Sequence, residues 1–308
     1  MRIAVVGIGG VGGFYGGKLA LAYAGKREHD VIFIARGEHL QAIRKKGLCL
    51  ITPEGETLTV VPTLATDRSE EVGTLDIVLF CTKSYGLEES ARMITENVHD
   101  GTVVLPLLNG VNITERLRKV LPGCTVLNGC VYIGSNIEGP GVVHHKGGTG
   151  QLFFGPDRKE DIEKFRYLED LLRGAGIKAD LVEDVAVQVW TKYIFVSSFA
   201  GITSLRGKTF GAVLENDEDR KMLQGLMAEI EAVAKAKGVR LPTGIVEESL
   251  RKGASFPYAT KTSMQLDYEK GRPTEIDIFM EYIMNAGKEL GIATPIHEEV
   301  YRGLMERR

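Results

Sequence analysis

The chain opens with Met1-Arg-Ile-Ala-Val-Val-Gly7-Ile-Gly9-Gly-Val-Gly12, and this stretch decides the fold. An apolar run, residues 3–6, stops at Gly7 and is followed by the spacing Gly7-x-Gly9-x-x-Gly12. A segment that can form a helix, residues 14–24, comes next. A strand, a tight glycine turn and a helix in this order predict a dinucleotide-binding turn.

Each glycine has an expected task. Gly7 permits the turn, Gly9 lets a pyrophosphate approach the backbone because it lacks Cβ, and Gly12 lets helix and strand pack closely. The N-terminus of the helix offers N–H groups and a favourable dipole to phosphate. The alternative is an ordinary glycine-rich turn, but such a turn does not need three glycines at this spacing. We therefore predict that the cofactor contacts the turn residues Gly7, Ile8, Gly9, Gly10, Val11 and Gly12.

Length and charge limit the class of protein. The 308 residues exceed one typical core, so two domains are expected. A formal net charge of −3 gives no electrostatic reason to expect a nucleic acid or an anionic membrane as partner. No apolar run reaches the length needed to span a bilayer, and the N-terminus has no basic region or cleavage site. We expect a cytoplasmic location.

The cysteines and histidines do not predict a metal site. None of the four cysteines, Cys49, Cys81, Cys124 and Cys130, forms a Cys-x-x-Cys pair, so buried free thiols are expected. His144 and His145 are adjacent, and adjacent residues on a strand point to opposite faces. We therefore expect no metal.

The first half of the chain alternates between strand and helix patterns. The near-continuous apolar run 77–81 is typical of a parallel strand that is covered on both faces. Segments 48–51 and 57–61 are expected to pair as a hairpin. The other expected strands are 3–6, 31–35, 102–108, 125–133, 142–145 and 151–154, and the expected helices are 14–24, 38–46, 87–97 and 113–120. This alternation predicts an α/β fold with a doubly wound, Rossmann-type sheet.

The second half has a different character, because helical patterns dominate from Asp184 onward. The expected helices are 184–204, 217–237, 260–269 and 276–290, with glycines and Pro273 between them. The boundary is placed near residue 183. The sequence thus predicts a dinucleotide-binding domain over 1–183 and a mainly helical substrate and catalytic domain over 184–308.

Residues at the ends of the parallel strands indicate the cofactor. The second strand ends at Arg36, where a dinucleotide-binding sheet usually has an acid for the ribose 2′-hydroxyl. A guanidinium can clamp a 2′-phosphate instead, which favours NADP(H); the alternative is a solvated surface arginine. Lys83 and Asn109 end two later strands, where ligands bind. A solvated lysine and a simple Asn-Gly turn remain the alternatives there.

Two segments of the second half offer candidates for proton transfer and substrate binding. Lys192 lies in an otherwise apolar helix, where burial in a cleft suits acid–base chemistry; a lysine on the solvated face is the alternative. Glu275 and Asp277 follow Thr274 at the start of a helix, where the helix dipole alone favours acids. The pattern by itself does not raise Glu275 above that explanation.

Together these motifs resemble the ketopantoate reductase (2-dehydropantoate 2-reductase) family over almost the whole chain. The shared motifs are the glycine turn, Arg36, Thr82-Lys83, Asn109-Gly110, Trp190-x-Lys192, Thr262-Ser263-Met264 and Thr274-Glu275-Ile-Asp277. The resemblance implies reduction of 2-dehydropantoate to pantoate with NADPH, on the pathway to pantothenate and coenzyme A. It also implies a Rossmann-type domain joined to a helical one, which could supply a homodimer face.

The resemblance assigns roles by position. It implies that Lys192 donates the proton and that Glu275 contacts the cofactor ribose and the substrate. Ser263 would bind substrate, Asn109 would lie between cofactor and substrate, and Lys83 would bind cofactor.

Some positions depart from the family pattern. Val196 and Ala200 stand where asparagines often face the substrate, and Thr260 and Glu281 replace an asparagine and a glycine. Ser197, Ser198 and Lys261 are the candidates to supply the lost polar contacts. A reductase of a less polar 2-keto acid and a non-catalytic NADP(H)-sensing protein are therefore the alternatives.

Overall fold

The computed structural model describes residues 1–26, 28–158 and 160–307. These residues form two compact units. The first comprises Met1–Leu108 and Ile113–Val185, and the second comprises Asn109–Asn112 and the chain from Ala186 onward. The first unit is α/β and the second is helical, which confirms the predicted fold class.

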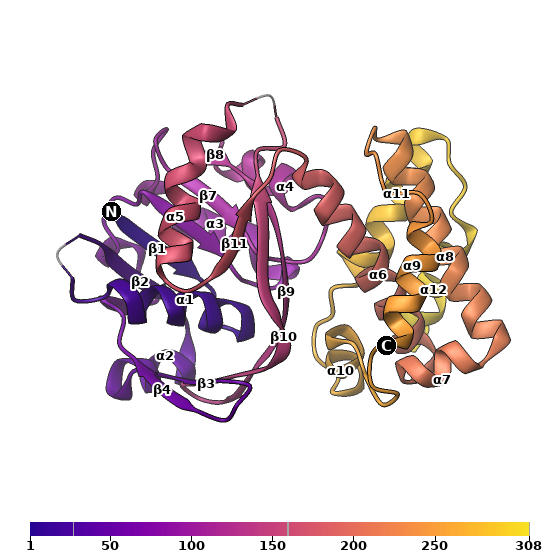
Figure 1. Cartoon of the computed structure of the whole chain (residues 1–308), viewed down its shortest axis with the longest axis horizontal. Helices are drawn as coiled ribbons and strands as arrows, with labels where there is room; N and C mark the ends of the chain where they lie inside the picture. The colour runs from indigo at the N-terminus through magenta and orange to yellow at the C-terminus, as the bar shows by residue number, and fades with distance from the viewer. Residues whose placement is uncertain (27, 159, 308) are drawn as a thin grey trace. The chain divides into compact units, whose positions relative to one another are not determined.

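The first unit contains a six-stranded parallel sheet with the strand order β5-β2-β1-β6-β7-β8 (Figure 1). The strands are β1 (Arg2–Val6), β2 (Asp30–Ile34), β5 (Leu64–Thr66), β6 (Ile77–Phe80), β7 (Val103–Pro106) and β8 (Thr125–Val126). Its helices are α2 (Gly37–Lys46), α3 (Leu87–Met93) and α4 (Ile113–Val120), with short 3₁₀ turns at 69–71, 84–86 and 95–97. Strands β6 and β7 are buried throughout, as their apolar runs predicted.

A second sheet, absent from the sequence-based prediction, lies in the same unit. Its order is β11-β10-β3-β4, and β9 pairs with β10. The strands are β3 (Leu48–Ile51), β4 (Thr57–Val60), β9 (Asn128–Gly139), β10 (Val142–Gly155) and β11 (Lys178–Leu181), accompanied by a 3₁₀ turn at 162–165 and α5 (Arg166–Gly174). The β3–β4 hairpin is confirmed. The two strands expected at 142–145 and 151–154 are one strand, because register shifts absorb the glycines between them.

Helix α1 (Gly10–Tyr23) packs against both sheets (Figure 1). A Cβ on Gly12 would lie 2.0 Å from the carbonyl oxygen of Gly7, and a Cβ on Gly13 would lie 2.6 Å from Val143 of β10. Neighbouring glycines that face different sides of α1 thus let each of the two sheets approach the helix closely. The predicted start at residue 14 was late, because these glycines look like helix breakers in the sequence although the packing requires them.

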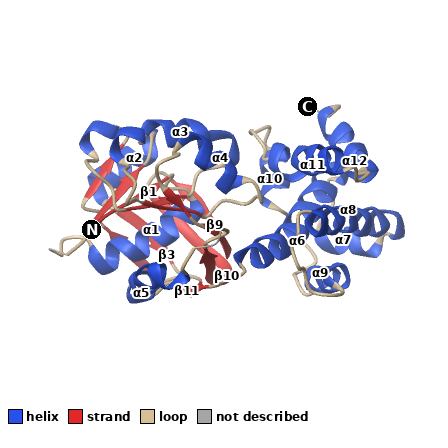
Figure 2. Cartoon of the chain, turned by 90° about the horizontal axis from the view of Figure 1, so that it is seen from above, coloured by secondary structure: helices blue, strands red, loops and turns tan. Residues whose placement is uncertain are grey.

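Every regular element described in the second unit is a helix (Figure 2). The helices are α6 (Val185–Arg206), α7 (Phe210–Glu215), α8 (Asp217–Ala236), α9 (Ile245–Ala254), α10 (Ser263–Glu269), α11 (Tyr282–Leu290) and α12 (Pro295–Met305), and a π-helical turn (Asp277–Glu281) precedes α11. Helices α7, α9 and α12 were not predicted. The segment 276–290 was predicted as one helix, and the π-turn interrupts it at its start.

Helix α6 is longer and more apolar than expected of any segment from the sequence, since no apolar run was expected to reach the length of a membrane span. It has 22 residues, and an 18-residue window within it has a mean hydropathy of 1.3, so the helix meets the length and composition of a membrane span. However, 67% of that window is buried inside the described structure, where Phe199 stacks on Phe210 with ring centroids 4.1 Å apart. The apolar composition therefore reflects a core helix, in which most of the small polar residues are buried and Lys192 is only partly buried.

Candidate active site

The glycine turn joins the end of β1 to the first turn of α1. Gly7 has φ +92°, in the left-handed region that favours glycine, and its N–H donates to the Ile34 carbonyl over 2.9 Å. Gly9 occupies the N-cap position of α1, and it has no side chain with which to cap the first N–H groups. The turn therefore presents helix N–H groups to a ligand, as an anion site requires.

The space around each glycine tests whether a dinucleotide fits. A Cβ on Gly9 would meet nothing within 4 Å, so the side of the turn at Gly9 is open. A Cβ on Gly10 would lie 2.1 Å from the carbonyl oxygen of Ser135 in β9, so the other side is closed by protein. Gly9 is thus the glycine whose missing side chain leaves room for a pyrophosphate, and the turn fits the cofactor.

Arg36 follows β2 and occupies the N-cap position of α2. Its Nη1 lies 3.1 Å from Oε1 of Glu89 in α3, and the two side chains are 68% and 74% exposed. The pair is solvated and therefore weak, so Arg36 can turn to another anion at little cost. Glu89 is a neighbour that the sequence did not indicate.

Lys83 is the third residue after β6 and is partly buried, and its carbonyl accepts a hydrogen bond from the N–H of Gly86 over 3.0 Å. The next residue, Ser84, is fully buried. Its carbonyl accepts a hydrogen bond from Nη2 of Arg116 over 2.7 Å. Lys83 therefore stands at the carboxyl end of a central strand, in a loop whose backbone is held from α4.

Asn109 and Lys192 are brought together although 83 residues separate them. Lys192 Nζ donates to Asn109 Oδ1 over 2.7 Å. Lys192 is partly buried on α6, and Asn109 belongs to the segment 109–112 that clusters with the helical unit. The pair combines an ammonium donor with a carboxamide, the types of group that hold and protonate a carbonyl oxygen.

Glu275 is 2% exposed and directly precedes the helix that contains the π-turn. The π-turn frees backbone carbonyls, and α6 satisfies them: Tyr193 donates its hydroxyl to the Ile278 carbonyl over 2.5 Å, and Ser197 donates to the Phe279 carbonyl over 2.8 Å. Burial raises the pKa of Tyr193 well above its usual value. These bonds fix the start of this helix against the turn of α6 that follows Lys192.

Ser263 is exposed at the first residue of α10. Its neighbour Thr262 contacts Thr203 of α6, with the two Oγ1 atoms 3.1 Å apart. Thr203 lies eleven residues after Lys192, about 16 Å along the helix axis. The structure thus anchors Ser263 at a different level of α6 from the Lys192–Asn109 pair.

The three suggested substitutes for missing substrate contacts have other surroundings. Ser197 and Ser198 are both fully buried, and Ser197 is engaged with the π-turn. Lys261 pairs with Glu269 on the surface over 2.9 Å. Val196 is partly buried and Ala200 is buried. No sequence pattern indicated the roles of Tyr193, Ser197 or Arg116, because each role depends on a backbone carbonyl of a distant segment.

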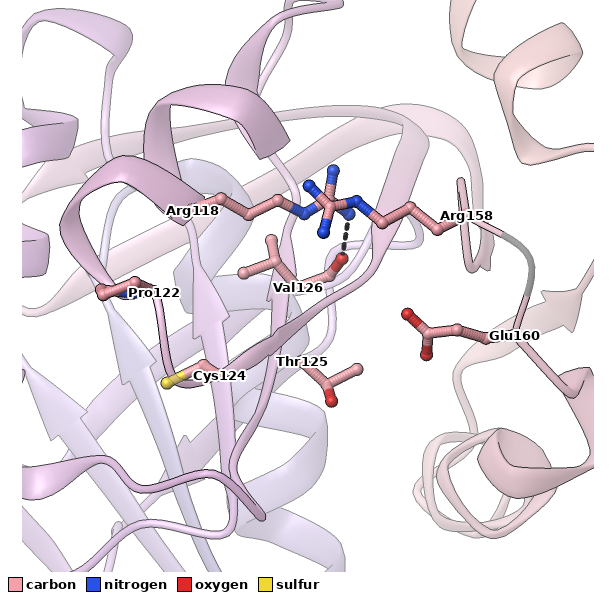
Figure 3. A pocket seen from close by; sticks show the side chains of 7 residues that line it. All are labelled: Arg118, Pro122, Cys124, Thr125, Val126, Arg158 and Glu160. Carbon is pink, nitrogen blue, oxygen red and sulfur yellow. Dashed lines mark hydrogen bonds between the residues drawn. The ribbon is translucent and has the colours of Figure 1, made fainter.

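The four cysteines are free thiols, as predicted, but only Cys130 is buried, and Cys49, Cys81 and Cys124 are partly exposed. Among the described residues, no group of three His, Cys, Asp or Glu side chains is arranged to hold a metal ion. A cavity of about 260 Å³ lies beside β8, lined in part by Arg118, Arg158 and Glu160 (Figure 3). Its lining includes none of the predicted site residues.

Comparison with known proteins identifies the family. The profile of ketopantoate reductase PanE/ApbA matches residues 3–159, and the profile of its C-terminal domain matches residues 184–307. The chain belongs to the ketopantoate reductase family. The resemblance drawn from the motifs is thereby confirmed, and family membership supports an oxidoreductase that uses a nicotinamide dinucleotide and a small keto acid.

Individual relatives span the whole chain. An uncharacterized oxidoreductase, YkpB of Bacillus subtilis, is 31% identical and covers 99% of this chain and 98% of its own length. The structure of a PanE/ApbA family ketopantoate reductase from Ralstonia eutropha is similar with a TM-score of 0.89 at 29% identity, covering 100% and 98% of the two chains. A 2-dehydropantoate 2-reductase structure from Porphyromonas gingivalis has a TM-score of 0.84 at 33% identity, covering 99% of each.

Proposed function

We propose that this protein reduces 2-dehydropantoate to pantoate with NADPH, a step toward pantothenate and coenzyme A. The observation that carries the proposal is the contact between Lys192 and Asn109. A protein that only senses the cofactor needs no proton donor, whereas a reductase needs one at the carbonyl oxygen. Membership of the ketopantoate reductase family supports the same substrate.

Different residues of the chain are proposed to bind the cofactor, protonate the product and bind the substrate. The glycine turn and Lys83 bind the dinucleotide, which supplies the hydride when bound. Lys192, as an ammonium, stabilises the oxyanion that forms and donates its proton to it. Asn109 accepts a hydrogen bond from Lys192 and so holds the ammonium in one orientation. Glu275 binds polar groups of the substrate and contacts the cofactor ribose. Ser263 is assigned to the substrate by the family resemblance alone, because its neighbour Thr262 contacts α6 at Thr203, away from Lys192.

The central experiment measures NADPH oxidation with 2-dehydropantoate. Lys192→Ala should lower kcat by about 10²–10⁴-fold, the usual contribution of a positioned proton donor. Lys221→Ala, an exposed lysine on α8, is the matched control and should retain wild-type activity. Wild-type protein without turnover, or full activity in Lys192→Ala, would refute the mechanism.

NADPH is proposed over NADH because of Arg36. Its exposed, weakly paired guanidinium is available to a 2′-phosphate, and no carboxylate takes its place at the end of β2. Arg36→Ala should raise the KM for NADPH by about ten-fold, the loss of one charge-assisted contact, and leave the KM for NADH unchanged. Equal effects on both cofactors would contradict this preference.

A second candidate function is the reduction of a less polar 2-keto acid, which Val196 and Ala200 favour. Neither side chain can hydrogen bond to a hydroxylated substrate, and Ser197 is engaged elsewhere. A panel of 2-keto acids with and without a distal hydroxyl decides between the two. Higher kcat/KM for 2-dehydropantoate rejects this second candidate.

We also propose a homodimer formed through the helical unit and a cytoplasmic location. The helical unit has a groove of about 620 Å³ beside Phe256 and Tyr258, whose side chains are exposed. Light scattering tests the dimer, and Tyr258→Lys should shift it to monomer if the groove is the interface.

The proposed cytoplasmic location has a separate test, which is cell fractionation.

A further inference from the structure

Arg116 of α4 holds the loop that carries Lys83. Its Nη2 donates to the Ser84 carbonyl over 2.7 Å. The same guanidinium binds Glu88 in the first turn of α3 with two bonds, Nε to Oε1 over 2.6 Å and Nη2 to Oε2 over 2.8 Å. One side chain therefore ties together α4, α3 and the loop between β6 and α3.

This arrangement is geometrically restrictive. The Arg116 side chain is 17% exposed and that of Glu88 is 32% exposed, so the contact is partly shielded from water. The hydrogen bonds from Arg116 hold the pKa of Glu88 below its usual value. A guanidinium is planar, and two bonds to one carboxylate fix that plane. The hydrogen bond from Nη2 to the Ser84 carbonyl then fixes the peptide of Ser84.

We propose that Arg116 is a positioning residue that acts on the cofactor through Lys83. The inference rests on the proposed function, in which Lys83 binds the dinucleotide. Ser84 is the residue after Lys83, so movement of its peptide moves the backbone from which the lysine side chain extends. Arg116 thus sets where the ammonium of Lys83 meets the cofactor.

The same helix contains a matched control. Arg118 binds Asp157 with two bonds. It also donates Nη2 to the Val126 carbonyl over 2.6 Å, as Figure 3 shows. Its side chain is also 17% exposed. Arg116 and Arg118 therefore make equivalent contacts, but only Arg116 holds the loop of Lys83.

The experiment measures the Kd for NADPH by fluorescence titration, with thermal unfolding of each variant. The variants are Arg116→Lys, Arg118→Lys and Lys83→Ala, together with Lys83→Ala combined with each arginine change. Lysine keeps the charge but cannot form the fork. Arg116→Lys should raise the Kd by about ten-fold, the loss of one well-placed charged contact, while Arg118→Lys should not.

The double variants separate positioning from general stability. In the Lys83→Ala background, Arg116→Lys should change the Kd by less than about two-fold relative to Lys83→Ala alone. The reason is that Arg116 acts through the Lys83 ammonium, which this background lacks. An unchanged Kd in Arg116→Lys overturns the proposal, and so does an equal rise with and without Lys83. A wild-type protein that binds NADPH but does not reduce 2-dehydropantoate refutes the proposed reaction alone. Absence of NADPH binding refutes both.

Discussion

Replacing Gly9 by alanine should separate cofactor binding from folding. The backbone at Gly9 has φ −90°, which alanine adopts, and the added Cβ would meet no atom within 4 Å. The cost to folding is that of an N-cap glycine changed to alanine, about 1 kcal/mol at most. The methyl group occupies the open side of the turn, where the pyrophosphate is expected. Loss of one charge-assisted hydrogen bond there costs about 1.5–3 kcal/mol, which raises the Kd for NADPH by roughly 10–100-fold.

The control for this prediction is Gly10→Ala. Its Cβ would lie 2.1 Å from the backbone oxygen of Ser135, so β9 or α1 must move, at a cost of about 1–3 kcal/mol. Thermal unfolding should therefore place Gly9→Ala above Gly10→Ala in stability, while fluorescence titration shows weaker NADPH binding in Gly9→Ala than in wild type. A folded Gly9→Ala protein with the wild-type Kd would show that the pyrophosphate does not approach this glycine.

Two further predictions concern stability. Asp219 is buried and pairs with Lys208 over 2.5 Å and with Arg206 over 2.8 Å. Asp219→Ala should therefore lower the free energy of unfolding by about 3 kcal/mol, because it leaves two cations without their buried partner. Urea titration measures this, and a change below about 1 kcal/mol contradicts the prediction. Burial lowers the pKa of His297, and Glu229, 2.6 Å away, offsets this only in part. The unfolded chain therefore binds the proton first, and stability should fall as pH drops from about 7 to 5. His297→Gln should flatten this slope, and an unchanged slope would assign it to other groups.

The sequence determined the local chemistry of the first unit. The spacing of Gly7, Gly9 and Gly12, with an apolar run before it, predicted both the turn and the parallel sheet around it. The reason is that a buried parallel strand and a glycine turn depend on residues within one short segment. The positions of Arg36 and Lys83 at strand ends followed from the same local order.

The sequence did not predict the second sheet, nor the π-turn that interrupts the helix after Glu275. The glycines of β10 look like turns when read alone, and only pairing with β9 shows a continuous strand. The π-turn at 277–281 exists because Tyr193 and Ser197 satisfy its freed carbonyls from another helix. The residue pattern of 276–290 carries no information about hydrogen-bond partners that lie more than 80 residues earlier.

The sequence by itself thus determined the fold class, the glycine turn and the residue types of the candidate site. The motifs named Lys192 and Asn109 as candidates, but only the tertiary structure brought the ammonium within 2.7 Å of the carboxamide. It also decided that Arg116 holds the loop of Lys83. The physical reason is the same in each case: a hydrogen bond between distant segments depends on where folding places both partners, and neither segment encodes the position of the other.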